Sequence, residues 1–92
     1  MSAPAYKRVL LKLSGEALVG TKKYGIDDSF ISDLAAQLVE IHKKNVQLII
    51  VIGGGNFFRG SDLEKLGIQR VTADHMGMLA TVINSLALQS SI

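Results

Sequence analysis

Two glycine-bearing segments of the chain carry residue types that could bind a phosphate. Residues 12–16 read Lys-Leu-Ser-Gly-Glu, and residues 53–56 read Gly-Gly-Gly-Asn. Glycines leave no side chain to hold a ligand away and can adopt positive φ, so successive backbone N–H groups can point at one anion. The ammonium of Lys12 and the planar guanidinium of Arg59 both suit phosphate oxygens. Together, these features predict a phosphate-binding site.

Each of these residues also has an explanation without a ligand. A glycine run after a strand can be a tight turn, Lys12 can reach solvent or pair with an acid, and Arg59 can be a solvated loop residue. Asp74 could accept hydrogen bonds from ribose hydroxyls, but its residue type favours a helix cap. His42 and His75 have no partners at a metal-ligand spacing, so no metal site is predicted.

The elements around these segments indicate an α/β fold. Residues 9–13 and 46–52 are nearly continuous apolar runs, which predict strands buried on both faces. Between them, Asp27 is placed to cap an amphipathic helix that Asn45 can end. This strand, helix, strand order predicts parallel strands whose carboxyl ends, and therefore both glycine segments, lie at one edge of the sheet.

The remaining segments predict a loop and two further helices. Gly20 and Gly25 bracket the sequence Thr-Lys-Lys-Tyr, which predicts a hairpin tip or a mobile loop. Residues 61–66 predict a short helix ended by Gly67, and a longer helix should begin near residues 72–74. The long helix is apolar on two sides, so we expect the sheet to cover one side and another domain or subunit the other. One apolar stripe comprises Met76, Leu79, Ala80, Ile83 and Ala87, and the other comprises Met78, Val82 and Leu86.

Composition is that of a globular protein. The 92 residues are 48% hydrophobic and 20% charged, enough for one small domain that is marginally stable alone. The net charge of +2 is scattered without a run of like charges, so we expect no binding to nucleic acid or membrane. The absence of cysteine excludes a disulfide framework and favours a cytoplasmic location. The longest apolar run, residues 46–52, is too short to cross a bilayer.

Two common nucleotide-binding signatures are missing from the chain. No Gly-x-x-x-x-Gly-Lys-Ser/Thr run occurs, which excludes a P-loop enzyme of the usual kind. The dinucleotide pattern Gly-x-Gly-x-x-Gly matches Gly53 and Gly55 but meets Phe58 at the third glycine. A dinucleotide-dependent oxidoreductase half-domain is therefore disfavoured, and saturable NAD binding would be the result that supports it.

Taken together, the motifs closely resemble the bacterial UMP kinases (uridylate kinases) of the amino-acid kinase superfamily. The motifs that carry the resemblance are residues 12–16, 51–56, 58–60 and 74–81, and Asn84. They occur in the family's order and spacing, and the resemblance covers residues 6–87. Aspartokinases and acetylglutamate kinases share the lysine and the Gly-Gly elements but differ around the first loop and lack the last motif.

The resemblance implies a three-layer αβα fold with a mainly parallel sheet. It also implies transfer of the ATP γ-phosphoryl group to UMP, giving UDP and ADP in pyrimidine nucleotide biosynthesis, with Mg²⁺. A homo-oligomer, usually a hexamer, with GTP and UTP as effectors, is implied as well. The resemblance implies that Lys12 and Arg59 act in catalysis and that Gly54 and Asp74 bind UMP. The residues it implies for ATP binding are Lys12, Leu13, Ser14, Gly15, Gly55 and Arg59. It also implies a loop that binds the effector GTP, formed by Gly20, Thr21, Lys22, Lys23, Tyr24 and Gly25.

Members of this family are more than twice as long as the present chain. We therefore expect residues 1–92 to form the N-terminal part of a single amino-acid kinase domain that lacks its C-terminal ATP-binding part and is inactive alone. The alternative is a non-catalytic nucleotide-binding regulatory module. Such a module would bind UMP but would form no ADP from ATP and Mg²⁺.

Overall fold

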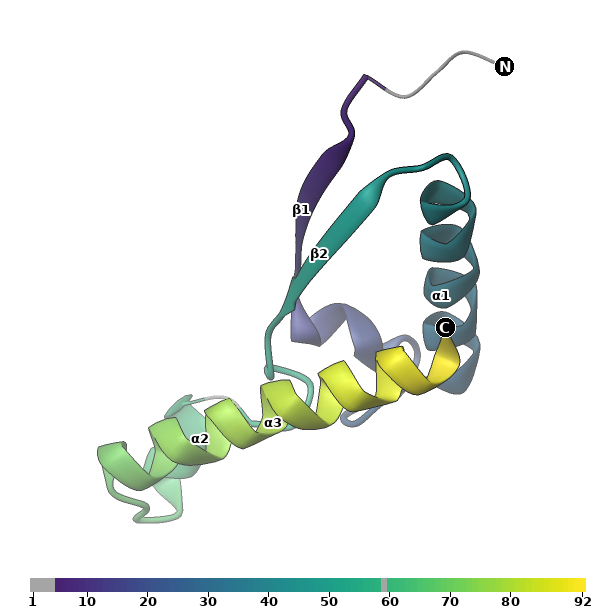
Figure 1. Ribbon diagram of the computed structural model, residues 1–92. Helices are drawn as coiled ribbons and strands as arrows, with labels where there is room; N and C mark the ends of the chain where they lie inside the picture. Colours follow the sequence, from purple (N-terminus) through teal and green to yellow (C-terminus); the bar gives the residue numbers. More distant parts are fainter. Residues whose placement is uncertain (1–4, 59) are drawn as a thin grey trace.

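The computed structural model describes residues 5–58 and 60–92, and it describes side chains for 5–58 and 62–92. Its elements are β1 (Arg8–Leu13), the 3₁₀-helix η1 (Gly15–Val19), α1 (Asp28–His42), β2 (Gln47–Ile52), α2 (Gly60–Lys65) and α3 (Arg70–Ser91). Strands β1 and β2 pair in parallel, with Lys12 opposite Val51 and Leu13 opposite Ile52. Both strands therefore end at the same edge of a two-stranded sheet, as the sequence predicted (Figure 1).

Helix α1 begins and ends where its capping residues predict. The Oδ1 atom of Asp27 accepts a hydrogen bond of 3.1 Å from the backbone N–H of Phe30, which satisfies one of the free amides at the helix start. Asn45 follows the last turn with φ at 63° and reverses the chain into β2. The buried positions of α1 are Ile31, Ala35 and Leu38.

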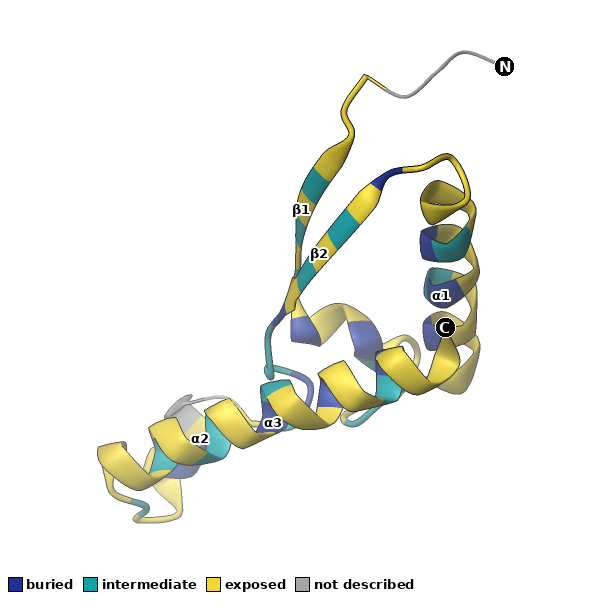
Figure 2. Cartoon of the chain, viewed as in Figure 1, coloured by how far each residue is buried: buried dark blue, intermediate teal, exposed yellow. Residues whose placement is uncertain are grey.

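The core covers only one face of the sheet. A cluster of α1 residues and Leu88 of α3 packs against alternate strand residues, among them Leu11 and Ile50. The residues between them point away from this cluster, and Leu10 and Ile49 are 61% and 50% exposed (Figure 2). The prediction of strands buried on both faces is therefore wrong for the described chain, because the core cluster lies on one side of the sheet only.

The segment between β1 and α1 is not a hairpin. A hairpin needs a strand on each side, but η1 precedes residues 20–25 and α1 follows them. Leu18 of η1 is 1% exposed, and its carbonyl accepts the N–H of Asp27 at 2.7 Å. The carboxylate of Asp27 also accepts hydrogen bonds from the N–H and the hydroxyl of Thr21. These bonds fold the segment into turns, which side-chain periodicity did not reveal.

Helix α3 begins at Arg70, earlier than the predicted start at residues 72–74. Its N-cap residue, Gln69, makes no side-chain capping hydrogen bond. Asp74 lies in the second turn, where its Oδ1 atom is 4.0 Å from the Nε of Arg70. The interpretation of Asp74 as a helix cap is therefore wrong, because the backbone is already helical four residues before it.

The buried stripe of α3 also differs from the predicted one. Ala80, Asn84 and Leu88 are buried, whereas Leu79 and Ile83 are 63% and 50% exposed. The stripe is rotated because Asn84 turns inward to make hydrogen bonds, although its polarity alone would place it in water. Much of the helix is exposed (Figure 2), and its exposed residues include Met78, Leu79, Val82, Ile83 and Leu86, which form a broad apolar face.

The described chain is elongated. Its radius of gyration is 15.4 Å and its extents are 53 × 25 × 19 Å, whereas a compact domain of this length has a radius of about 12 Å. The length comes from α3, which runs past the end of the sheet and carries α2 beside its first half (Figure 1). Among the described helices, none combines the length and apolar character needed to span a membrane.

Candidate phosphate-binding site

The two glycine segments meet at the carboxyl ends of the strands. The N–H of Gly53 donates to the carbonyl of Leu13 at 3.0 Å, which extends the strand pairing into the loops. A Cβ atom on Gly15 would overlap the carbonyl oxygen of Gly53 and lie 2.8 Å from the nitrogen of Gly54. The two backbones therefore touch, and only glycine at position 15 permits this approach.

A hollow of about 490 Å³ opens beside this contact. Its lining includes all the described residues predicted to contact ATP, namely Lys12, Leu13, Ser14, Gly15 and Gly55. Arg59, the other residue predicted for ATP and for catalysis, lies outside the described residues. The structure thus gathers the described residues of the predicted ATP group around one opening, although they come from two separate parts of the chain.

The polar groups of this hollow differ in what they offer a ligand. Lys12 projects from the exposed face of β1, so its ammonium is accessible. The Ser14 hydroxyl accepts the N–H of Glu16 at 3.2 Å and so caps η1. Within the described residues, the amides of Gly54 and Gly55 donate to no protein acceptor. Of these two glycines only Gly55 lines the hollow, so the Lys12 cation and the Gly55 amide can face an anion here.

Glu16 brings a negative charge to the same wall. A Cβ atom on Gly55 would lie 2.8 Å from the Cγ of Glu16, so this side chain packs directly on the glycine loop. Magnesium in nucleotide enzymes is held by one or two carboxylates together with substrate phosphates. Glu16 fits that role in residue type. In the described parts of the chain, no group of three or more His, Cys, Asp or Glu side chains is placed to hold a metal ion.

Close packing explains why residues 53–55 are glycines. The sequence suggested that residues 53–55 turn with positive φ, but the glycines with positive φ are Gly20, Gly25 and Gly67. A Cβ atom on Gly54 would instead lie 2.8 Å from the Cβ of Ala80 and 3.0 Å from the carbonyl oxygen of Gly77. The loop thus lies flat on α3, and a larger residue at position 54 would push it away.

The residues predicted for UMP lie on the other side of this loop. Asp74 lines a second hollow, of about 450 Å³, together with Gly77 and Thr81 of α3. Gly54 packs on the same two residues of α3, while its neighbours in the loop line the first hollow. The glycine loop therefore separates two adjacent hollows: the described residues predicted for ATP line the first, Asp74 lines the second, and Gly54 packs on α3 between them.

The predicted effector segment, Gly20, Thr21, Lys22, Lys23, Tyr24 and Gly25, lies largely on the surface. The ammonium of Lys22 donates to the carbonyl of Ile26 at 3.1 Å, so it points back to its own chain. At the far end, the N–H of Gly25 donates to the carbonyl of Asn56 at 2.8 Å. The segment is therefore attached directly to the end of the glycine loop.

Two buried asparagines were not predicted as functional residues. Asn56 ends the glycine loop and Asn84 lies in α3, and their side chains are bonded to each other. Both belong to the motifs that carried the family resemblance, but no role was assigned to them. The signal that could have found Asn84 is the spacing of Ala80, Asn84 and Leu88, where a polar residue interrupts an apolar row at intervals of four.

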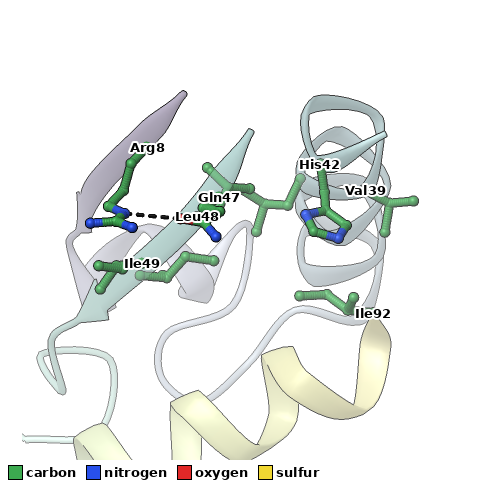
Figure 3. Close-up of a pocket in the computed structure, with 9 residues that line it drawn as sticks. Arg8, Val39, His42, Gln47, Leu48, Ile49 and Ile92 are labelled. Atoms are coloured by element: carbon green, nitrogen blue, oxygen red, sulfur yellow. Dashed lines mark hydrogen bonds between the residues drawn. The ribbon is translucent and has the colours of Figure 1, made fainter. Parts of the chain in front are cut away.

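A further hollow, of about 530 Å³, lies away from the glycine loops (Figure 3). It is formed by Leu48 and Ile50 of β2, by α1, and by Ile92. Its polar lining includes Gln47, whose Oε1 atom accepts a hydrogen bond of 2.9 Å from the Nε of Arg8. The hollow is mainly apolar and borders the edge of β2 that does not pair with β1, and the Arg8 guanidinium in its lining is bonded to Gln47.

Comparisons with known proteins agree with the sequence motifs. The profile of the amino acid kinase family matches residues 7–92. The chain is 61% identical over 87 residues to the uridylate kinase of Bacteroides thetaiotaomicron, covering 95% of this chain and 37% of that protein. It is 53% identical over 89 residues to the uridylate kinase of Dichelobacter nodosus, covering 97% of this chain and 37% of that protein. The chain therefore spans little more than a third of the length of these relatives.

Solved structures show the same relationship. The crystal structure of UMP kinase from Bacillus anthracis superposes with a TM-score of 0.86 at 44% identity, covering 94% of this chain and 35% of that one. The UMP kinase from Ureaplasma parvum superposes with a TM-score of 0.83 at 45% identity, covering 91% of this chain and 35% of that one. The resemblance drawn from the sequence motifs is confirmed by these matches.

Proposed function

This chain belongs to the amino acid kinase family, and from that premise we propose that it is the phosphate-holding part of a UMP kinase. The whole enzyme would transfer the γ-phosphoryl group of ATP to UMP and release UDP and ADP, a step of pyrimidine nucleotide biosynthesis. The observation that supports this most directly is the backbone contact between Gly15 and residues 53–54, beside Lys12. Two phosphate groups could approach each other across this loop.

The proposed roles follow the positions of the residues around the loop. Lys12, Leu13, Ser14, Gly15 and Gly55 would hold ATP, and Gly54 and Asp74 would hold UMP. Lys12 and Arg59 would stabilise the transferring group. Phosphoryl transfer has a loose transition state with charge spread over the equatorial oxygens, so a site of placed cations and amides can catalyse it without a covalent step.

Magnesium would enter this site with ATP. When bound, the ion supplies positive charge that neutralises the phosphate oxygens during transfer. Glu16 lies against Gly55 and is the carboxylate that this segment could contribute. The chain's own task would be to hold the phosphates in line and to keep the two nucleotides on opposite sides of the glycine loop.

We also propose that residues 1–92 are the N-terminal part of one three-layer αβα domain. The exposed face of the sheet and the unpaired edge of β2 (Figure 3) are where further strands and helices of such a domain would pack. The remainder of the domain would complete the ATP site. Homo-oligomer formation, as a hexamer, would cover the apolar face of α3. GTP would act as an effector through residues 20–25, and UTP would be a further effector. A cytoplasmic location stays a prediction from the sequence.

The test of the activity uses the full-length product of the gene that encodes this chain. With ATP, Mg²⁺ and UMP, we expect ADP and UDP to form in equal amounts, and we expect no turnover when UMP is replaced by NAD and an oxidisable substrate. Binding of UMP without ADP formation would instead identify a regulatory module. Saturable NAD binding without a response to UMP would reject the kinase proposal.

A further inference from the structure

Two buried asparagines tie the glycine loop to the elements around it. Asn84 is 0% exposed and Asn56 is 2% exposed. The Nδ2 atom of Asn56 donates to the Oδ1 of Asn84 at 3.0 Å, and the Nδ2 of Asn84 donates to the Oδ1 of Asn56 at 2.7 Å. We refer to Asn56 and Asn84 as the asparagine pair.

The asparagine pair also reaches two backbone carbonyls. The Nδ2 of Asn56 donates to the carbonyl of Gly25 at 2.9 Å, and the Nδ2 of Asn84 donates to the carbonyl of Gly53 at 2.7 Å. Each side-chain amide has two N–H groups, so all four are engaged. Because both carbonyls can only accept, each amide must turn its nitrogen toward them, and the orientation of the pair has no equivalent alternative.

The bond to Gly53 has a consequence for the next residue of the loop. The carbonyl of Gly53 and the N–H of Gly54 belong to one planar trans peptide, so they point in opposite directions. A bond that holds the Gly53 carbonyl on Asn84 therefore also sets the direction of the Gly54 N–H. An apolar residue at position 84 could fill the same space, but it would not fix the rotation of this peptide plane.

We propose that Asn84 is a positioning residue that aims the N–H of Gly54 at the phosphate of the nucleotide, with Asn56 holding the Asn84 amide in place. The proposal rests on the proposed function, because the phosphate of UMP is the ligand assigned to Gly54. Asn84 itself touches no ligand. Its effect is transmitted through one peptide plane, so its loss should weaken recognition of the phosphate and spare recognition of the nucleoside.

The experiment compares Asn84→Ala with Ser85→Ala in the full-length gene product. Ser85 is the next residue of α3, and among the described residues its hydroxyl bonds the Thr81 carbonyl alone, at 2.8 Å, so its loss leaves the loop untouched. For each variant, the KM for UMP and the inhibition constant of uridine, which lacks the phosphate, are measured at a temperature where circular dichroism shows a fully folded protein. A purely structural role would lower the melting temperature without changing the ratio of the two constants.

We expect Asn84→Ala to raise the ratio of the UMP KM to the uridine inhibition constant by about tenfold or more. This is the change in affinity expected when one hydrogen bond to a charged group is lost. Ser85→Ala should leave it within about twofold. An unchanged ratio in Asn84→Ala would overturn the inference alone, whereas a wild-type protein without affinity for UMP would overturn the proposed function as well.

A second variant and a measurement on the wild type cover the case in which Asn84→Ala does not fold. Asn56→Ser removes the side-chain amide that holds the Asn84 amide in place. It should therefore also raise the ratio of the UMP KM to the uridine inhibition constant. In the wild-type protein, UMP should slow hydrogen exchange at the Gly54 amide more than at the Gly53 amide, which is already bonded to Leu13. Equal effects at the two amides, or an unchanged ratio in Asn56→Ser, would contradict the proposal.

Discussion

Lys12 stands on the face of β1 that the core leaves open, one residue before the strand ends. In this position the side chain is exposed to water and still lines the hollow formed with Gly15 and Gly55. A compact ammonium on a flexible stem can follow a phosphate as it moves. Within the described residues, the site therefore combines the Lys12 cation with a glycine loop that is held in place by close backbone contacts.

The first prediction concerns this charge. In the full-length protein, Lys12→Ala should lower kcat/KM for ATP by about 100-fold or more, since removal of one stabilising group at a transferring phosphate has an effect of that order. Lys7→Ala is the matched control, because Lys7 is an exposed lysine just before the same strand. Steady-state kinetics check both variants, and near-normal turnover in Lys12→Ala would exclude a role for this lysine.

The second prediction contrasts two glycines that lie against each other. Gly77→Ala places a Cβ in open space within α3, so we expect stability to rise by about 0.5–1 kcal/mol, the usual gain for this change in a helix. Gly54→Ala should lower stability by about 1–3 kcal/mol, because its Cβ would lie 2.8 Å from that of Ala80. Thermal unfolding of both variants checks the opposite signs, and equal shifts would argue against close packing of the loop on α3.

At the scale of elements, the start of α1 holds the preceding turn. The Oδ1 of Asp27 accepts the N–H of Phe30, while Oδ2 accepts the N–H and the hydroxyl of Thr21. These hydrogen bonds, with that from Phe30 the strongest influence, lower the pKa of Asp27 below its usual 3.8. One carboxylate therefore joins the helix to the segment of residues 20–25.

A third prediction follows from this lowered pKa. A carboxyl group that is more acidic in the folded state stabilises the protein above its unfolded pKa and loses that effect as the pH falls through the folded value. Asp27→Asn keeps a good capping side chain but removes the charge. The melting temperature of the wild type should exceed that of Asp27→Asn above pH 3.8, and the difference should shrink below it. A difference that stays constant over the acidic range would contradict this account.

The elements of this fold were predictable to different degrees. The strand order and the limits of α1 could be predicted because apolar runs, Asp27 and Asn45 are local signals. The buried stripe of α3 was predicted on another face of the helix, because it depends on Asn84, whose burial is favourable only once the Gly53 carbonyl and Asn56 are beside it. Such partners, 28 and 31 residues away, leave no periodic trace in the sequence.

The candidate site shows the same division. The meeting of the two glycine segments could be predicted, because parallel strands joined by one helix must end together. The flat packing of Gly54 on α3 was missed, since positive φ is the usual reason for glycine and close approach to another element cannot be read from one segment. Residues 20–25 were predicted as a hairpin tip or a mobile loop, and the hairpin alternative failed for a related reason, because η1 is stabilised by burial of Leu18 rather than by a repeating pattern.

At the scale of the whole molecule, the described chain leaves an unusual amount of apolar surface exposed. One side of α3 is apolar and uncovered, and Leu86 and Val82 on it are 59% and 53% exposed. Contiguous apolar faces of this kind mark contact surfaces in proteins. Since the opposite side of the helix already packs on the glycine loop through Ala80, an interface on α3 would lie one helix diameter from the candidate site.

The last prediction tests whether a second copy covers this face. In the full-length protein, the double variant Val82→Lys, Leu86→Lys should separate the oligomer into smaller species, because burying two lysine charges in an apolar contact is costly. Gln89→Lys adds the same charge to α3 at an exposed polar position and should leave the assembly intact. Sedimentation velocity measures both. If the double variant keeps its sedimentation coefficient and instead melts at a lower temperature, the face is covered by other parts of the same chain, and self-association must use another surface.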